Sequence, residues 1–263
     1  MKRLLLTIVT ALLPAILFSQ TTQKEYLDRY NSLCARVGAD GVGVETLLER
    51  WEKDFPEDLN MLNAKISFFL LKSQSYEVVQ KDQPRYLGSK PLMTLKDSLG
   101  VEHHYFNDVI FDDDYFSQAN KLMDKAINLN PMELQLRSDK LSMLLAYEKE
   151  NPDMALDCIQ SLIDENFTKK PKWTDIDGKA VEDGYFDEFI QGYCYMFSQI
   201  ATPASYEAFK AVSEKMLKYE PKNVNYLNNL GAYASLAKKN DKQALKYYKK
   251  VLTFLLNCNK MVQ

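Results

Sequence analysis

Residues 225–252, NYLNNLGAYASLAKKNDKQALKYYKKVL, decide the fold class because they contain two consecutive amphipathic helices. In the first half, apolar residues recur at i, i+3, i+4 and i+7, and the stripe contains Gly231, which lets another helix approach closely. The second half repeats the pattern from Ala244 to Val251. Between the halves, residues 238–241 are polar, and the Asn or Asp there can cap the second helix. The stretch therefore predicts a helical hairpin.

The hairpin resembles a unit of the tetratricopeptide repeat (TPR) family, whose Leu-Gly, Tyr, Ala, Phe, Ala and Pro positions recur over about 34 residues. The interval from Gly231 to Ala244 is one residue longer than in the family. The resemblance covers residues 115–165 and 206–252, and over residues 26–71 it depends on helix spacing and a closing proline. It implies hairpins stacked in a right-handed superhelix, whose first helices line a concave groove that binds proteins or peptides.

Three prolines that close repeats, Pro56, Pro131 and Pro221, predict where the array is interrupted. They are 75 and 90 residues apart. These intervals are longer than one and two repeats of about 34 residues, respectively. The extra residues fall at about 73–112 and 167–183, where helical periodicity is lost. The sequence therefore predicts an all-α fold, a right-handed α-solenoid of about five helix hairpins (TPR-like) with two short β-hairpin or loop inserts.

Each insert contains a predicted turn between two short extended segments. In the first insert, residues 94–106 form a hairpin around Ser98-Leu99-Gly100. In the second insert, residues 173–182 surround Asp177-Gly178, the kind of dipeptide that two-residue hairpin turns prefer.

The first 20 residues have the pattern of a secretory signal peptide, since Lys2 and Arg3 precede an apolar run to Phe18. Cleavage is expected near residues 19–21, which leaves a single TPR-like helical repeat domain over residues 21–263. No later apolar stretch reaches the roughly 18 residues of a membrane span. We therefore expect an exported bacterial protein that is periplasmic or secreted.

The composition argues against nucleic acid as a partner. Removal of Lys2 and Arg3 from the 33 basic residues leaves 31 against 36 acidic residues, a formal net charge of −5 without long blocks of one sign. Binding to a nucleic acid backbone requires a concentrated basic face. The 46% of hydrophobic residues instead indicates a large packed core.

No motif predicts a catalytic, metal or cofactor site. His103 and His104 would point to opposite faces of a strand, so they cannot jointly hold one metal ion without distortion. The segment Asp175–Gly178 resembles part of a calcium-binding loop, but Trp173 and Gly184 stand where acidic ligands are needed. The sequence G-x-S-x-G does not occur. The expected class is therefore a non-enzymatic protein with no cofactor.

The four cysteines, Cys34, Cys158, Cys194 and Cys258, lack C-x-x-C spacing and predict neither a zinc site nor a thioredoxin-like site. They are expected to be buried helix residues. An oxidising compartment also permits one disulfide. Cys158 and Cys194 are the candidate pair, because they lie on consecutive helices that should pack as antiparallel neighbours.

Neutral polar side chains recur on the predicted groove-lining faces of three first helices. Amides and hydroxyls suit an extended peptide backbone, whereas a carboxylate-ended ligand would require Lys or Arg. The alternative is that these exposed faces are polar only because they meet water. The candidate peptide-binding residues are Asn60, Asn63, Ser67, Gln135, Ser138, Ser142, Asn225, Asn228 and Ser235.

The C-terminal helix, predicted over residues 241–258, is more apolar than the end of a repeat array should be. Its inward stripe runs from Ala244 to Leu255, yet Leu252 and Leu256 widen the apolar surface. Either the chain is shortened at this end, or the helix mediates self-association.

These patterns together predict a protein- or peptide-binding scaffold of the periplasm or cell envelope. The alternative function is an envelope enzyme or glycan-binding protein whose site is built from the two inserts. Aromatic side chains and carboxylates clustered on one pocket beside Tyr105, Phe106 and Trp173 would favour that alternative.

Overall fold

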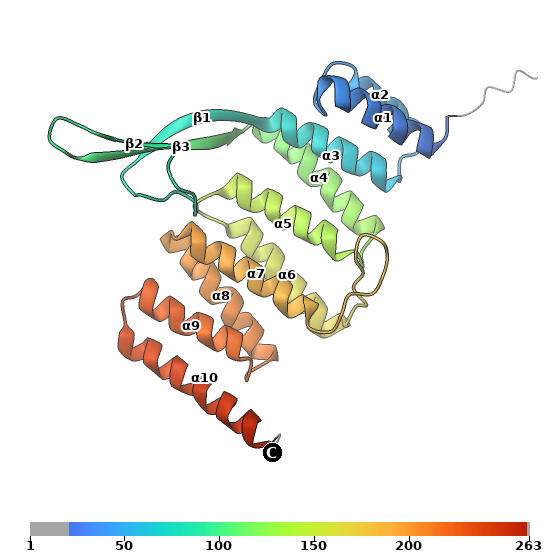
Figure 1. Ribbon diagram of the computed structural model, residues 1–263. Helices are drawn as coiled ribbons and strands as arrows, with labels where there is room; N and C mark the ends of the chain where they lie inside the picture. Colours follow the sequence, from blue (N-terminus) through green and yellow to red (C-terminus); the bar gives the residue numbers. More distant parts are fainter. Residues whose placement is uncertain (1–20, 262–263) are drawn as a thin grey trace, which may run out of the picture.

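The computed structural model describes residues 21–261, with side chains to residue 256, so the predicted signal peptide lies outside the described residues. Over this range ten helices form five hairpins stacked side by side, with two inserts, which confirms the predicted solenoid (Figure 1). No helix among the described residues is long and apolar enough to cross a membrane. The hairpins are α1 (Gln23–Val37) with α2 (Val44–Asp54), α3 (Leu59–Ser73) with α4 (Asp113–Leu129), α5 (Leu134–Glu148) with α6 (Asp153–Lys169), α7 (Tyr185–Ile200) with α8 (Pro203–Tyr219), and α9 (Val224–Leu236) with α10 (Asp241–Met261).

Side-chain caps fix where many of these helices begin. The Thr22 hydroxyl accepts a hydrogen bond from the Glu25 N–H at 3.2 Å, and the Glu25 carboxylate accepts one from the Thr22 N–H, which completes a capping box. The Asn240 side chain accepts from the Gln243 N–H at 3.0 Å, so the predicted cap of the last helix is confirmed. The other capping side chains are Asp58 on α3, Asp112 on α4, Thr202 on α8 and Asn223 on α9.

The apolar stripes of the hairpins merge into one continuous core. Trp51, Phe197 and Tyr226 are among its fully buried side chains. A Cβ atom at Gly231 would lie 2.4 Å from the Tyr248 ring, so α9 and α10 approach as closely as the sequence predicts.

The first helices of successive hairpins also contact one another directly. Between α5 and α7, the Ser138 and Tyr193 hydroxyls lie 3.0 Å apart. Between α7 and α9, Gln191 and Asn229 exchange two amide hydrogen bonds of 3.0 and 2.9 Å. These bonds hold α5, α7 and α9 side by side.

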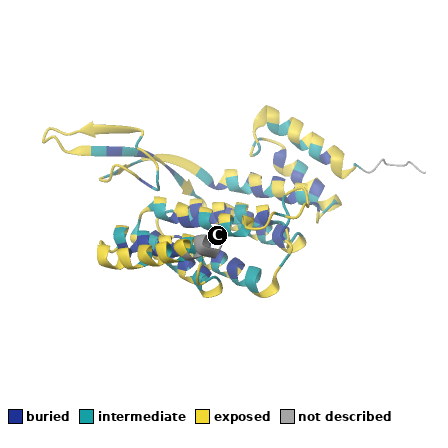
Figure 2. Cartoon of the chain, turned by 60° about the horizontal axis from the view of Figure 1, so that its bottom comes forward, coloured by how far each residue is buried: buried dark blue, intermediate teal, exposed yellow. Residues whose placement is uncertain are grey.

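The first insert, residues 74–111, forms a sheet that projects from the solenoid and is called the arm below (Figure 1). The predicted hairpin is present as β2 (Met93–Lys96) and β3 (Glu102–Phe111). A third strand, β1 (Gln74–Lys81), follows α3 directly and was not predicted. It pairs antiparallel with β3, so the strand order is β1-β3-β2. Much of the arm is exposed to solvent (Figure 2).

Both inserts contain the same kind of turn. At Asp97 and at Asp175, one carboxylate oxygen accepts two backbone N–H bonds, and a glycine three residues later has a positive φ. The turn in the second insert therefore has three residues, because Asp175 pairs with Lys179. The prediction of a two-residue turn at Asp177-Gly178 was wrong, since the Asp175 side chain organises a longer loop.

The second insert is anchored by an indole ring. Trp173 is 4% exposed and packs against Leu134 and Leu162. Its indole N–H donates to Asn166 at 2.9 Å. The insert is thereby held against α5 and α6.

The candidate disulfide between Cys158 and Cys194 is not formed, since both residues carry free thiols. They do not face each other, because α6 packs mainly against α5 and α8 rather than against α7. The second insert separates α6 from α7 along the chain. Cys194 is buried as expected, whereas Cys34 and Cys158 are only half-buried.

The end of α10 also departs from the prediction. Ala244 is buried against α9, but Leu255, expected on the inward stripe, is 47% exposed. With 21 residues against 13 in α9, α10 extends beyond its partner. Leu252 and Leu256 are exposed, as predicted.

Candidate functional site

A hollow of about 510 Å³ lies between α3 and α5, on the side of the solenoid formed by the first helices. We call it the groove hollow. It contains three of the nine predicted peptide-binding residues, Asn63, Ser67 and Ser142. Its volume is within the range of roughly 300–1,000 Å³ found for ligand pockets. The remaining lining residues are Ile66, Leu70, Gln74, Met123, Asp139, Met143 and Ala146.

The groove hollow combines apolar walls with a few polar groups. Ile66 and Met143 are buried, whereas Asn63, Ser67 and Ser142 are exposed at its rim. Such a surface can bury an apolar side chain and offer amide and hydroxyl partners to a peptide backbone.

The other six predicted residues lie elsewhere on the first helices. Ser138 is half-buried and bonded to Tyr193, so it joins two helices and is not a free groove residue. The Gln135 amide donates to Asp139 at 2.7 Å on the exposed face of α5. Asn60 is exposed near the start of α3. On α9, Asn225 and Asn228 are exposed, while Ser235 is half-buried and lies 3.4 Å from Asp241.

Sequence reasoning named no candidate residue on α7 and missed lining residues on α5. Tyr195 is 63% exposed and Met196 is 40% exposed on α7, and Asp139 and Ala146 line the groove hollow on α5. Helix α7 follows the second insert, so neither a closing proline nor a Leu-Gly pair aligns it with the repeat. The buried spacing of Ile190, Cys194 and Phe197 is the signal that could have identified its exposed face.

A second hollow, of about 400 Å³, lies where the arm joins the solenoid, and we call it the arm slot. Ala146 lines both hollows, so the arm slot adjoins the groove hollow. Its walls come from β3, from the loop between β1 and β2, and from the end of α5. They are formed by Tyr86, Leu87, Ser89, Lys90, Leu92, Phe106, Asn107, Asp108, Val109, Ala146 and Lys149.

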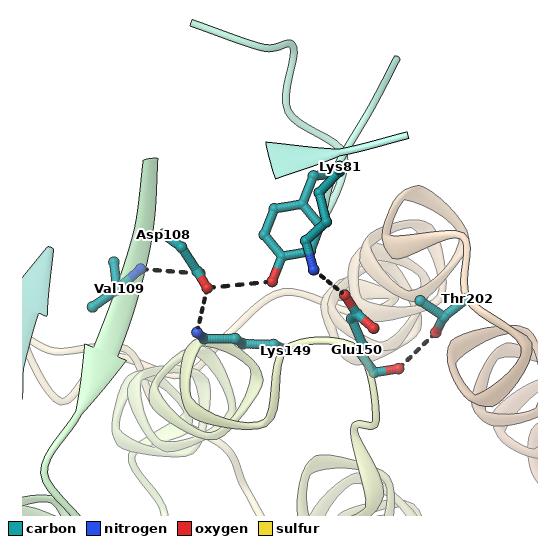
Figure 3. Close-up of polar contacts among 7 residues, drawn as sticks. Lys81, Asp108, Val109, Lys149, Glu150 and Thr202 are labelled. Carbon is teal, nitrogen blue, oxygen red and sulfur yellow. Dashed lines mark hydrogen bonds and ion pairs between the residues drawn. The ribbon is translucent and has the colours of Figure 1, made fainter. Parts of the chain in front are cut away.

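Polar contacts fix the arm to the solenoid at this slot (Figure 3). The Lys149 ammonium donates to the Asp108 carboxylate at 2.7 Å, and both side chains are largely buried. Farther along, Lys81 pairs with Glu150 at 3.2 Å, and Thr202 donates to the Glu150 carbonyl at 2.6 Å. These contacts connect β1 and β3 with the end of α5 and the start of α8.

Tyr86 is a buried aromatic wall of the arm slot. Burial, followed by the negative charge of Asp108, raises the pKa of its hydroxyl above the ordinary value. The Lys81 ammonium lies 4.2 Å from the Tyr86 ring centroid, a cation–π contact. Tyr86 therefore stays neutral and serves as a packing surface.

The two inserts do not share a pocket. Phe106 lines the arm slot, but Trp173 is buried in the separate cluster with Leu134 and Leu162. Phe106 and Trp173 therefore do not form the shared pocket that would favour an enzyme or glycan site built from both inserts.

Carboxylates with raised pKa values lie outside both hollows. Burial raises the pKa of Glu133 and of Glu148. The Glu148 carboxylate accepts the Ala155 N–H at 2.9 Å and so caps the start of α6, a structural role.

The two histidines occupy opposite faces of β3, as predicted. His103 lies beside Gln80 and Asp97, whereas His104 is buried with its Nδ1 2.9 Å from the Thr94 hydroxyl. Among the described residues, no group of three or more His, Cys, Asp or Glu side chains could hold a metal ion.

No family model matches the sequence, and no curated protein matches it. Among solved structures, the chain is similar to "MamA 41-end from Desulfovibrio magneticus RS-1", with 13% identity, a TM-score of 0.38, and coverage of 89% of this chain and 95% of that chain. It is likewise similar to the "MamA RS-1 ArsTM double mutant", with the same identity and TM-score and coverage of 90% and 96%. Similarity at this level assigns no function.

Proposed function

We propose that this chain is an exported, TPR-like scaffold of the bacterial periplasm or cell envelope that binds proteins or extended peptides and catalyses no reaction. The observation that carries the proposal is the groove hollow, which lies between two first helices and brings Asn63, Ser67 and Ser142 together. Their neutral amide and hydroxyl groups can donate to and accept from a peptide backbone.

Burial of partner side chains would supply the binding free energy in this proposal. The hollow offers apolar side chains from α3, α4 and α5, and burial of apolar surface is worth about 25 cal/mol per Å² before the costs of association. The polar rim would then select an extended backbone, because unpaired amide groups are costly once water is excluded.

The test is affinity capture of partners from a cell-envelope fraction by the immobilised chain from residue 21 onward. Ser67→Trp fills the groove hollow, and Ser117→Trp places the same ring on the exposed face of α4 as the matched control. We expect partners captured by the wild type to be lost with Ser67→Trp and retained with Ser117→Trp. Equal capture by both variants would contradict a role for the groove hollow.

The outer part of the predicted groove is tested by replacing Asn225 and Asn228 with Ala. Exposed polar substitutions change the unfolding free energy by about 0.5 kcal/mol or less. We expect weaker capture with an almost unchanged thermal unfolding temperature. Unchanged capture would limit the binding surface to the helices nearer the arm.

Export is tested by the N-terminal sequence of the protein recovered from a periplasmic fraction. We expect the chain to begin near residues 20–22, because the first 20 residues have the pattern of a signal peptide. Recovery of chains that still begin at Met1, in the cytoplasm alone, would contradict export.

A further inference from the structure

One edge of β3 is left without a partner strand where it borders the arm slot. On one side β3 pairs with β1 from His104, opposite Lys81, to Phe111, opposite Gln74. On the other side β2 pairs only as far as Met93 opposite Tyr105. The edge of β3 beyond Tyr105 on the β2 side is therefore open.

Three hydrogen bonds show which residues of β3 face this open edge. The Asp112 N–H donates to the Ser73 carbonyl at 2.7 Å, so the backbone N–H and C=O groups of even-numbered residues in β3 point towards β1. The Tyr105 carbonyl accepts from the Leu92 N–H at 2.7 Å, so the backbone N–H and C=O groups of odd-numbered residues point towards β2. The Val109 N–H agrees with this alternation, since it donates to the Asp108 side chain at 3.0 Å instead of to β1.

Asn107 therefore points its backbone N–H and C=O towards the open edge. Its neighbours on the same edge are Tyr105, which is bonded to Leu92, and Val109, whose N–H is covered by Asp108. Among the described residues, neither main-chain group of Asn107 has a partner on this side. Asn107 and Val109 also line the arm slot, so the open edge forms one wall of an existing hollow.

We propose that the arm slot binds a short extended peptide segment, which adds as a strand to β3 at Asn107. This inference rests on the proposed function and deepens it, because it names the form of the ligand and how it is held. The peptide main chain pairs with the N–H and C=O of Asn107 and with the C=O of Val109, in the manner of strand addition to an exposed sheet edge.

The side chains of the slot determine what the peptide must carry. Residues of an added strand alternate between the two faces of the sheet. On the face of β3 that carries Phe106, the slot is lined by Leu87, Phe106 and Ala146 and by the Asp108–Lys149 pair. Because those two charges already pair with each other at 2.7 Å, we expect the incoming side chain on this face to be apolar. On the other face, the next side chain lies with exposed Asn107 and meets solvent. The ligand is therefore an extended segment with an apolar residue flanked by residues that tolerate water.

The position of the slot fits a peptide that continues into the groove hollow. Ala146 lines both hollows, and Gln74 at the start of β1 lines the groove hollow. A segment paired with Asn107 can thus continue past Ala146 to the helices α3 and α5.

The experiment selects phage-displayed random twelve-residue peptides on the immobilised chain from residue 21 onward. Such a library contains every four-residue sequence many times over, so it covers the short segment that the slot holds. Selected peptides are then synthesised with a methyl group on one backbone nitrogen at a time. We expect methylation to weaken binding about tenfold at alternate positions only, because strand pairing uses every second N–H and each lost bond costs about that factor.

Three protein variants locate the site. Asn107→Pro removes the N–H that faces the slot, and Ser89→Trp fills the slot without changing β3. Ser67→Trp fills only the groove hollow. We expect both Asn107→Pro and Ser89→Trp to abolish binding of the selected peptides. If Asn107→Pro does not fold, as judged by circular dichroism, the Ser89→Trp variant and the methylation pattern decide the result.

Two outcomes would overturn the inference. Peptides that bind Ser89→Trp normally, lose affinity for Ser67→Trp and show no alternation would place binding in the groove hollow, so the proposed function would stand without strand addition. Selection of no peptide would show that the slot takes no extended segment. The proposed function would then still be decided separately, by capture from the envelope fraction.

Discussion

Replacement of Asp108 by Ala should loosen the arm from the solenoid without unfolding the solenoid. The Asp108 carboxylate accepts from Lys149 at 2.7 Å and from the Val109 N–H at 3.0 Å. The side chains of Asp108 and Lys149 are only 10% and 20% exposed, so removal of the carboxylate leaves an ammonium group largely buried without a partner.

The free energy that Asp108→Ala should cost lies between two known limits. Breaking a fully buried ion pair costs about 3–5 kcal/mol, whereas exposed pairs contribute at most about 1 kcal/mol. With most but not all of the Asp108–Lys149 pair covered, we expect Asp108→Ala to cost about 2–3 kcal/mol. The double variant with Lys149→Met should cost less than the sum of the single variants, because it removes the unpaired charge as well.

Native-state hydrogen exchange measures this effect locally. The opening free energy of amides in β3 should fall by the expected amount, while that of amides in α9, far along the solenoid, should not change. Glu150→Ala is the matched control, since its pair with Lys81 is 52% and 30% exposed and should contribute at most about 1 kcal/mol. A change below about 0.5 kcal/mol in β3 for Asp108→Ala, or an equal change in α9, would refute the reasoning.

Three further predictions follow from how far particular side chains are buried or exposed. Burial raises the pKa of the Cys194 thiol to about 12, so a thiol reagent at pH 8 should modify Cys194 only after the chain is denatured. Mass spectrometry of the Cys194 peptide measures this, and rapid modification in the folded chain would contradict the burial. Leu252 and Leu256 are 56% and 52% exposed, so light scattering should show concentration-dependent association, which the double variant Leu252→Lys with Leu256→Lys should abolish. A strict monomer that neither substitution affects would exclude self-association through α10. Trp173→Ala should lower the unfolding free energy, measured by urea denaturation, by about 3 kcal/mol, because the Trp173 ring fills the cluster that anchors the second insert. A loss under about 1 kcal/mol would show that the insert is not anchored there.

The amino-acid sequence by itself determined the helical repeat. The apolar spacing around Gly231, the cap at Asn240 and the closing prolines are local signals, since a helix makes its backbone hydrogen bonds within one segment. The hairpin of β2 and β3 was likewise predictable, because its strands are adjacent and its turn contains Gly100.

Only the tertiary structure determined that a third strand, β1, forms and where the two hollows lie. Strand β1 forms only by pairing with β3, and Gln74 lies opposite Phe111, far along the chain. No periodicity within residues 74–81 reports such a partner, because strand hydrogen bonds join separate segments. For the same reason, three of the nine predicted residues meet in the groove hollow while Ser138 is used between helices. A repeat pattern predicts which face of a helix carries a residue, but the packing of neighbouring helices decides whether that face borders a hollow or is filled. In the arm, the length of β2 decides which part of the β3 edge stays open.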